Sequence, residues 1–152
     1  MRNAAPLTAA MFALVVTVGH GQTATSSSSG ATVTVYKQVG CGCCTIWADH
    51  LRKAGFKVSS MEVPDLNRVK KAYGVPPSVQ TCHTALVGDY VVEGHVPLDA
   101  IQKLLKERPK IAGIGVAGMP IGTPGMESGA RKDPYEVVAF DKNGATSTYL
   151  KK

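Results

Sequence analysis

The stretch from residue 32 to residue 56, TVTVYKQVGCGCCTIWADHLRKAGF, decides the expected fold. Its first part, Thr32–Gln38, alternates with a period of two and is rich in β-branched residues, which predicts a strand. From Cys43 to Ala54 apolar residues recur at helical spacing, and Gly55 is a typical residue after a helix end. A predicted strand therefore leads directly into a predicted helix, with cysteines at Cys41, Cys43 and Cys44 where they join.

The rest of the chain continues this alternation of strands and helices. We expect a strand over 56–63, a helix from Asp65 to about Tyr73, a β-hairpin over 84–92 turning at Gly88-Asp89, and a helix from Asp99 to about Glu107. The order is β-α-β-α-β-β-α. Together with a CxxC spacing at the start of the first helix, this order is typical of a thioredoxin-like α/β domain.

Two segments extend beyond that unit. Residues 113–128 are rich in Gly and Pro and predict a loop, which carries Met119 and Met126. Residues 135–149 predict an added C-terminal β-hairpin, in which Asn143-Gly144 suits a type I′ turn.

The N-terminal segment is typical of a leader. An apolar run of about a dozen residues, Leu7–Val18, follows Arg2 and precedes small residues, as in a secretory signal peptide. We assign residues 1–24 to a signal peptide, 25–31 to a Ser-rich linker and 32–152 to the folded domain. A buried N-terminal strand or helix is the alternative, and the serine tract opposes it. The mature protein is therefore expected in the periplasm.

Composition excludes several classes of partner. The 17 Lys and Arg exceed the 11 Asp and Glu, for a net charge of +6. These basic residues are scattered and are densest at Arg68, Lys70 and Lys71, without interleaved aromatic residues, which argues against nucleic acid and favours a solvated basic surface. No segment after the leader is long and apolar enough to span a membrane. No cysteine stands directly behind the apolar run of the leader, so a lipid-anchored form is not expected.

The four cysteines predict a site rather than a set of stapling disulfides. Three of them lie within four residues, where cross-linking would restrict the unfolded chain very little. Thioredoxin-like domains carry a cis-proline before the third strand, packed against the CxxC. Cys82 and His83 occupy the corresponding place here, so we expect them beside the first three cysteines.

Copper(I) suits this set of ligands better than zinc. A structural zinc site usually has two separated chelating pairs, and the second would be Cys82 with His83, which point in opposite directions in extended backbone. Zinc also leaves Cys43 unexplained, although it remains the alternative metal. Copper(I) favours thiolate and thioether, so bridging sulfurs in a small cluster could use every cysteine, and Met119 and Met126 would add soft ligands if their loop folds back.

The remaining aromatic candidates are less decisive. His83 stays open between a ligand and a turn residue, and His95 between a ligand and a structural residue. His50 lies seven residues, or about 10 Å of helix, beyond Cys43, so packing or hydrogen bonding is its expected role. Trp47 is expected in the core, shielding the site.

Several motifs in the chain carry a resemblance to one known family. They are CGCC at 41–44 with Trp47, His50 and Gly55-Phe56, then GVPP at 74–77, Cys82-His83-Thr84, VEGHVP at 92–97, and GMPxGxPGME at 118–127. Together they span about Val33 to Tyr149 and resemble a domain of unknown function found in exported bacterial metal-binding proteins, including the copper-resistance protein CopG. The resemblance implies a thioredoxin-like fold, thiolate-bound copper at Cys41, Cys43, Cys44 and Cys82, and a capacity for copper redox chemistry.

Three functions follow from these observations. The leading hypothesis is a periplasmic Cu(I)-binding protein in copper resistance or handling, with Cu(I)/Cu(II) cycling as an open extension. An enzymatic alternative is a thiol–disulfide oxidoreductase using Cys41 as nucleophile and Cys44 as resolving thiol. A zinc-stabilised interaction module is the third. Expected partners are the metal ion and other periplasmic copper-handling proteins.

Overall fold

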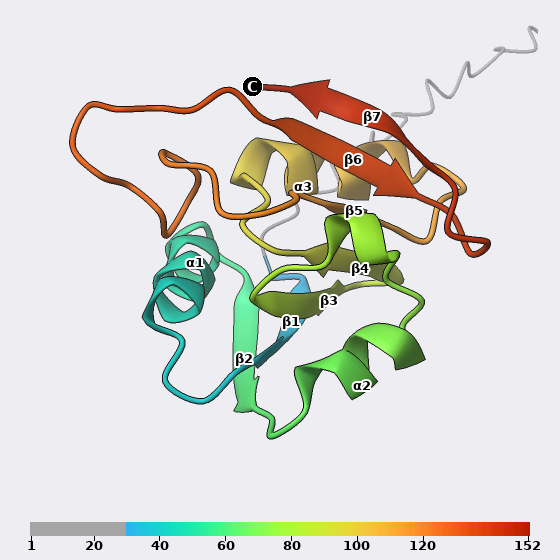
Figure 1. Ribbon diagram of the computed structural model, residues 1–152, viewed down its shortest axis with the longest axis horizontal. Coiled ribbons are helices and arrows are strands. Elements are labelled where there is room, and N and C mark those ends of the chain that lie inside the picture. Colours follow the sequence, from blue (N-terminus) through green and yellow to red (C-terminus); the bar gives the residue numbers. More distant parts are fainter. Residues whose placement is uncertain (1–29) are drawn as a thin grey trace, which may run out of the picture.

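The computed structural model describes residues 30–152, which form a mixed α/β fold (Figure 1). The expected signal peptide and most of the linker lie outside the described residues. The elements in chain order are β1 (Thr32–Lys37), α1 (Gly42–Lys53), β2 (Lys57–Glu62), α2 (Leu66–Ala72), a 3₁₀ turn (Pro77–Val79), β3 (His83–Val87), β4 (Tyr90–Glu93), α3 (Leu98–Glu107), β5 (Gly113–Gly115), β6 (Glu136–Phe140) and β7 (Thr146–Lys151).

All described strands belong to one sheet, in the order β2-β1-β3-β4-β5-β6-β7. The α1 crossover joins β1 to the parallel strand β2, and β3 lies antiparallel on the other side of β1. The tight turn at Gly88-Asp89 pairs Val87 with Tyr90 and makes β3 and β4 antiparallel. The predicted β-α-β-α-β-β-α order and each of its elements are confirmed to within a few residues at their ends.

Helices cover both faces of this sheet. Trp47 and Leu51 of α1 and Ile101 and Leu104 of α3 share one core with inward residues of the central strands. A second, smaller cluster on the other face packs Val75 and Val79, which follow α2, against strand residues. In Figure 1, α1 and α3 accordingly lie apart from α2. Because Trp47 is fully buried, it contributes to the core as expected.

Local chemistry explains where α1 begins. Gly40 has a φ of +75°, so the chain turns sharply after β1, and Cys41 is the extended N-cap residue. Cys43 and Cys44 therefore lie in the first helical turn. The next helix starts as predicted, because the Asp65 carboxylate accepts a hydrogen bond from the Arg68 amide at 3.2 Å.

The expectation of a loop throughout 113–128 is wrong at its first residues. Gly113–Gly115 form β5, which pairs in parallel with β4 and antiparallel with β6. A Cβ at Gly113 would lie 2.1 Å from the Val91 carbonyl oxygen, so glycine permits an approach that a side chain would block. Glycine has a low strand propensity, so the sequence pattern did not indicate this strand. The C-terminal hairpin is therefore the continuation of the sheet, joined through β5.

The type I′ turn expected at Asn143-Gly144 is also wrong. Only Gly144 has a positive φ in this turn, +83°, whereas a type I′ turn needs positive φ at both central residues. The Gly144 amide donates to the Asp141 carbonyl, and the Asp141 amide donates to the Ala145 carbonyl, which gives a three-residue loop. The Asp141 carboxylate also accepts from the Asn143 and Ala145 amides, so an aspartate stabilises the longer turn.

Candidate metal centre

The four cysteine sulfurs converge on one place. One Sγ atom each from Cys41, Cys43, Cys44 and Cys82 lie within 4.8 Å of one another. The first three come from the start of α1, and Cys82 comes from the bend that precedes β3. Cys44 is fully buried and the other three are partly exposed, so the cluster opens to the surface on one side. Cysteines 38 residues apart in the chain thus form one group of soft donors.

Two of these cysteines are joined. Cys41 and Cys44 form a disulfide with a Cα–Cα distance of 5.4 Å, whereas Cys43 and Cys82 are free. Cys43 Sγ lies 3.6 Å from Cys41 Sγ. Two electrons must reduce the disulfide before all four sulfurs can act as thiolate ligands. The site therefore has an oxidised form with two free thiols and a reduced form with four.

Two buried imidazoles lie beside Cys82. Its Sγ is 3.4 Å from His83 Nδ1 and 3.0 Å from His95 Nε2, and both histidines are fully buried. The expectation that Cys82 and His83 point in opposite directions is wrong, because Cys82 lies in a bend rather than in extended backbone. Cys82, His83 and His95 consequently form a second group of potential ligands.

The position of His95 could have been found from the sequence. The two-residue turn at Gly88-Asp89 pairs Thr84 with Glu93, and counting outward by the same register places Cys82 opposite His95. Gly94, with a φ of +72°, allows its backbone to lie close to Thr81, since a Cβ there would be 2.3 Å from Thr81 Cγ2. Hairpin register was thus the missed indication that His95 belongs to the site.

Burial controls the ionisation of these side chains. Burial, followed by the nearby charges of His95 and Lys70, holds the pKa of His83 well below its usual value. Burial likewise lowers the pKa of His95. Burial raises the pKa of the Cys82 thiol to about 11, from an ordinary value of 9.0. At neutral pH the metal-free site therefore holds neutral imidazoles beside a protonated Cys82.

The raised pKa of Cys82 gives a reactivity test. We expect iodoacetamide to alkylate Cys82 slowly at neutral pH in metal-free, oxidised Cys43→Ser protein, in which Cys82 is the one free thiol. The rate should keep rising with pH toward about 11, because the thiolate is the nucleophile. Quenched-flow alkylation followed by mass spectrometry measures it. A rate that levels off near pH 9.0 would contradict the effect of burial.

The two methionines return to the neighbourhood of the site through their loop. Gly125, next to Met126, lies so close to α1 that a Cβ would be 2.5 Å from the Cys43 carbonyl oxygen. The Gly118 carbonyl, next to Met119, accepts a hydrogen bond from Thr81 Oγ1 at 3.1 Å. Met126 is partly buried, and Met119 is 52% exposed. The backbone of the loop therefore folds back as the soft-metal hypothesis requires, while Met119 faces solvent.

The other two aromatic candidates have structural contacts. Trp47 Nε1 donates to the Val96 carbonyl at 2.9 Å, and its ring lies 4.5 Å from that of His83, which closes the inner side of the site. His50 Nε2 is 2.9 Å from a carboxylate oxygen of Glu127, and another oxygen of Glu127 accepts from the Gly125 amide. His50 thus helps to hold the methionine loop against α1.

A buried ion pair lies behind Cys82. Glu93 is fully buried and accepts hydrogen bonds from Lys70 Nζ at 2.5 Å and from the Thr81 amide at 2.7 Å. Thr84 Oγ1 donates to its second oxygen at 2.7 Å. The expectation of a solvated surface is wrong for Lys70, which is only 2% exposed. Burial raises the pKa of the Glu93 carboxyl, and Lys70 opposes that rise. This pair anchors the residue immediately before Cys82.

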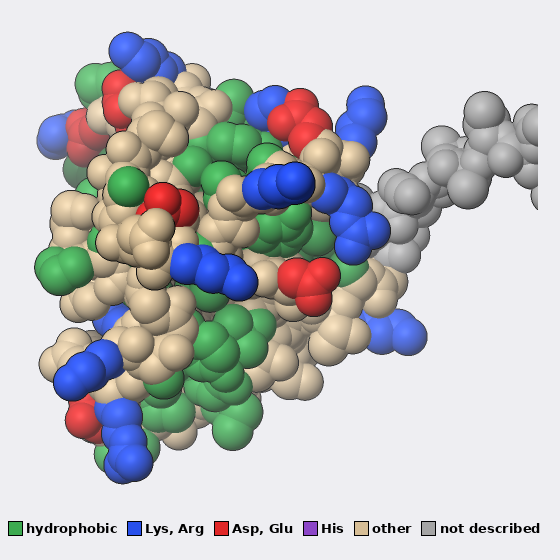
Figure 2. All heavy atoms as spheres, turned by 90° about the vertical axis from the view of Figure 1, so that its right-hand side faces the viewer, with side chains coloured by type: hydrophobic (Ala, Val, Ile, Leu, Met, Phe, Trp, Pro, Cys, Tyr) green, Lys and Arg blue, Asp and Glu red, His purple; other side chains and the backbone are tan. Residues whose placement is uncertain are grey.

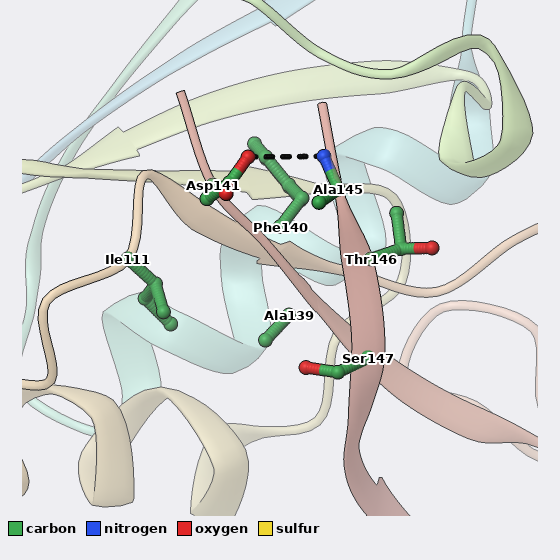
Figure 3. Close-up of a pocket in the computed structure, with 7 residues that line it drawn as sticks. All are labelled: Ile111, Ala139, Phe140, Asp141, Ala145, Thr146 and Ser147. Carbon is green, nitrogen blue, oxygen red and sulfur yellow. Dashed lines mark hydrogen bonds between the residues drawn. The ribbon is translucent and has the colours of Figure 1, made fainter. Parts of the chain in front are cut away.

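The hollows on the surface do not compete with this centre. One, lined by Ile111, Phe140 and Asp141 among others, lies beside the β6–β7 turn (Figure 3). Its carboxylate, Asp141, already accepts hydrogen bonds from the amides of the turn, as the dashed bond to Ala145 shows.

The face of the molecule in Figure 2 gives no sign of a nucleic-acid partner. It mixes basic with acidic side chains, without one continuous basic patch. Among residues 30–152, no helix is long and apolar enough to cross a membrane.

Comparisons with known proteins show the family of this chain. The model of a family described as "Protein of unknown function, DUF411" matches residues 79–126. Two solved structures, titled "Copper resistance protein copG- Form 2" and "Form 1", share 41% identity with the chain, each with a TM-score of 0.77. Each match covers 82% of this chain, and 99% and 98% of the two solved chains respectively. A search of curated protein sequences found no match. The chain belongs to the DUF411 family, which includes the copper resistance protein CopG.

Proposed function

We propose that this protein binds copper(I) through the thiolates of Cys41, Cys43, Cys44 and Cys82 and serves in copper resistance or handling. The observation that carries the proposal is the convergence of four sulfurs within 4.8 Å, one of them from a separate element of the fold. Copper(I) is the soft ion that prefers such donors. The relatives titled copper resistance protein support the choice of metal.

The arrangement favours a small cluster over a single tetrahedral zinc ion. Cys41, Cys43 and Cys44 lie within one helical turn, where bridging sulfurs use all three more readily than one ion would. His83, at the start of β3, and Met126, in the 118–127 loop, are proposed as further copper ligands. Met119 would become a ligand only if its side chain turned inward. Zinc remains the alternative metal.

Redox chemistry is part of the same proposal. Since Cys41 and Cys44 can form a disulfide, the number of thiolates changes with the redox state. Oxidation of these two thiolates to the disulfide releases two electrons, which would reduce two Cu(II) ions to Cu(I). We further propose that the fold is thioredoxin-like, supported by the β2-β1-β3-β4 order with the CxxC at the start of α1.

Export is proposed from the leader. A periplasmic location would give the protein access to incoming copper and to other periplasmic copper-handling proteins, after removal of residues 1–24. The cysteine site lies entirely within the folded domain, so leader removal would not alter its ligands.

A thiol–disulfide oxidoreductase is the second candidate, because such an enzyme alternates between a disulfide and two thiols at its CxxC, and Cys41 and Cys44 form such a disulfide. The position of Cys82, His83 and His95 argues against it. These residues lie beside the disulfide, where a substrate would approach. Cys43 Sγ lies 3.6 Å from Cys41 Sγ and would compete with Cys44 for a disulfide to Cys41. A catalyst would gain nothing from either additional thiol.

Two substitutions separate these functions. Cys43→Ser and Cys82→Ser should each lower the number of Cu(I) ions bound per reduced chain, or their affinity, because a hydroxyl is a poor replacement for thiolate. Copper analysis and competition with a Cu(I) chelator measure loading, and insulin reduction measures disulfide catalysis. Ile46→Ser is the matched control, since Ile46 is an exposed α1 residue that offers no soft ligand. Unchanged copper loading with strong insulin reduction would favour the enzyme instead.

A further inference from the structure

We propose that the surface around the opening of the thiolate site is a docking face for a partner protein, which delivers Cu(I) on methionine thioethers from an uncharged, apolar segment. The docking face comprises residues 38–46 and 117–119 with Cys82. This inference rests on the proposed function for the identity of the metal. It goes beyond that function by naming the surface that receives the partner and the chemistry that the partner presents.

Large apolar side chains are exposed at this opening. Among the described residues five such side chains are exposed, and Val39, Ile46 and Met119 are three of them, at 73%, 49% and 52%. The other two, Met61 and Tyr73, lie on β2 and at the end of α2. Exposed apolar side chains that gather at one place on a protein commonly mark a binding site, whereas single ones need no explanation.

The first two of these side chains lie beside cysteines of α1. The Cys41 amide donates to the Gln38 carbonyl at 3.2 Å, which closes a turn with Val39 at its outer corner. Ile46 follows Cys43 by three residues in α1, and residues at that spacing are neighbours on one side of a helix. Exposed apolar surface therefore borders the CGCC segment at both of its ends.

Met119 adds a soft donor beside Cys82. Thr81, the residue before Cys82, donates through Oγ1 to the Gly118 carbonyl at 3.1 Å, and Met119 is the next residue of the loop. More than half of Met119 is exposed, and Cys82 is itself partly exposed. An incoming Cu(I) ion would thus meet soft sulfur at the surface before it reaches the buried part of the cluster.

The docking face carries no charged residue. The chain has 17 Lys and Arg and 11 Asp and Glu. None of them falls in the three stretches that supply every cysteine and both methionines of the site, residues 38–48, 72–88 and 111–126. Charged residues that flank these stretches pair within the chain, Lys37 with Glu62 at 2.6 Å and Glu127 with His50 at 2.9 Å. An uncharged centre with a polar rim is the usual anatomy of a protein–protein interface.

Charge and metal chemistry together identify the partner. Because the docking face offers no counter-charge, a charged group of the partner would be buried there unpaired, so the partner's surface must be uncharged as well. Thiolate and thioether are the ligands that select Cu(I). In the periplasm exposed thiols form disulfides, which leaves the thioether of methionine as the stable donor. The partner therefore presents methionine on an apolar, uncharged segment.

The transfer is a ligand exchange without a redox step. Bonds from Cu(I) to methionine sulfurs of the partner break, bonds to cysteine sulfurs of this protein form, and the copper stays monovalent. Each cysteine thiol that becomes a ligand releases its proton to the solvent. Since thiolates are negative and thioethers are neutral, the cation moves toward the cysteine cluster. The receiving form is the reduced protein, in which Cys41 and Cys44 are no longer joined.

A charge placed on the docking face tests the proposal. The probe is Cu(I) carried by an uncharged peptide of methionine and glycine with blocked ends. Stopped-flow absorbance of the copper–thiolate bonds follows transfer to the reduced protein under anaerobic conditions. Val39→Lys and Ile46→Lys should each slow this transfer by about 10-fold, the lower end of electrostatic effects on association rates. Met61→Lys is the matched control, since Met61 is 50% exposed but lies on β2, and it should leave the rate unchanged.

An acidic peptide gives the opposite expectation. When aspartate replaces some of its glycines, transfer to Val39→Lys and Ile46→Lys should be faster than to the wild type. This gain should shrink as salt shortens the Debye length from about 30 Å at 0.01 M to about 8 Å at 0.15 M. Transfer from the uncharged peptide to the wild type should change little over the same range, because its docking involves no charged residue.

Loading with Cu(I) supplied as its acetonitrile complex, which needs no docking, separates this inference from the proposed function. All three lysine variants should load from that complex as fully as the wild type. Normal loading together with equal transfer rates from the uncharged peptide for Val39→Lys, Ile46→Lys and Met61→Lys would overturn the docking face alone. Failure of the reduced wild type to load from the acetonitrile complex would overturn the proposed function itself. Circular dichroism identifies a variant that does not fold, and the other docking-face variant then decides the outcome.

Discussion

Lys70→Met is expected to lower the free energy of unfolding by about 3–5 kcal/mol, the usual cost of removing one partner of a buried ion pair. Lys70 and Glu93 are 2% and 0% exposed, so no water replaces the lost ammonium. Glu93 would then remain in the core with hydrogen bonds from Thr81 and Thr84 but no counter-charge. Urea denaturation followed by circular dichroism measures the change.

The pH dependence of this effect has a definite sign. Burial already raises the pKa of Glu93, and loss of Lys70 should raise it further. A carboxyl with a raised pKa in the folded state favours folding while it is protonated, and that contribution is lost as the pH rises through the folded-state pKa. The destabilisation should therefore grow with increasing pH.

Lys71→Met is the matched control, since Lys71 is the neighbouring exposed residue of α2. Its substitution should change stability by no more than about 0.5 kcal/mol. The double variant Lys70→Met/Glu93→Leu should recover part of the loss, because no buried charge remains. Equal effects of Lys70→Met and Lys71→Met would show that the buried pair is not an anchor.

Gly125→Ala is expected to lower the free energy of unfolding by about 2–5 kcal/mol, the sum of about 1–2 for left-handed backbone and about 1–3 for overpacking. Gly125 has a φ of +88°, and a Cβ would lie 2.5 Å from the Cys43 carbonyl oxygen and 3.2 Å from His95 Nδ1. The loop would have to move away from α1. That movement would also break the hydrogen bond from His95 to Pro124 and draw the loop away from Cys43, so Cu(I) loading of the reduced protein should fall with stability.

Gly144→Ala separates backbone strain from the clash. Its φ of +83° is close to that of Gly125, but a Cβ there would meet nothing within 4 Å. We expect a loss of only about 1–2 kcal/mol and unchanged metal binding. If both glycine variants behave alike in urea denaturation and in Cu(I) loading, close packing of the 118–127 loop against the site has no energetic importance.

Most of the secondary structure could be predicted because its causes are local. Period-two alternation over 32–38, helical spacing after Cys43 and the Asp65 cap each act within a few residues, and each appears in the structure. The exceptions have tertiary causes. β5 is built from glycines that strand propensity disfavours, and it exists because Val91 and Phe140 approach from either side. The hairpin turn differs because Asp141 binds two amides that a tighter turn would not offer.

By itself, the sequence determined that three cysteines stand at the start of a helix and that a fourth precedes the third strand, because spacing along the chain settles both. Only the tertiary structure decided which imidazoles face Cys82, since a bend turned His83 toward it and hairpin register placed His95 opposite. It also decided that Lys70 is buried. A helix exposes or buries a lysine according to what packs on that face, and here the partner is Glu93, 23 residues away in the chain.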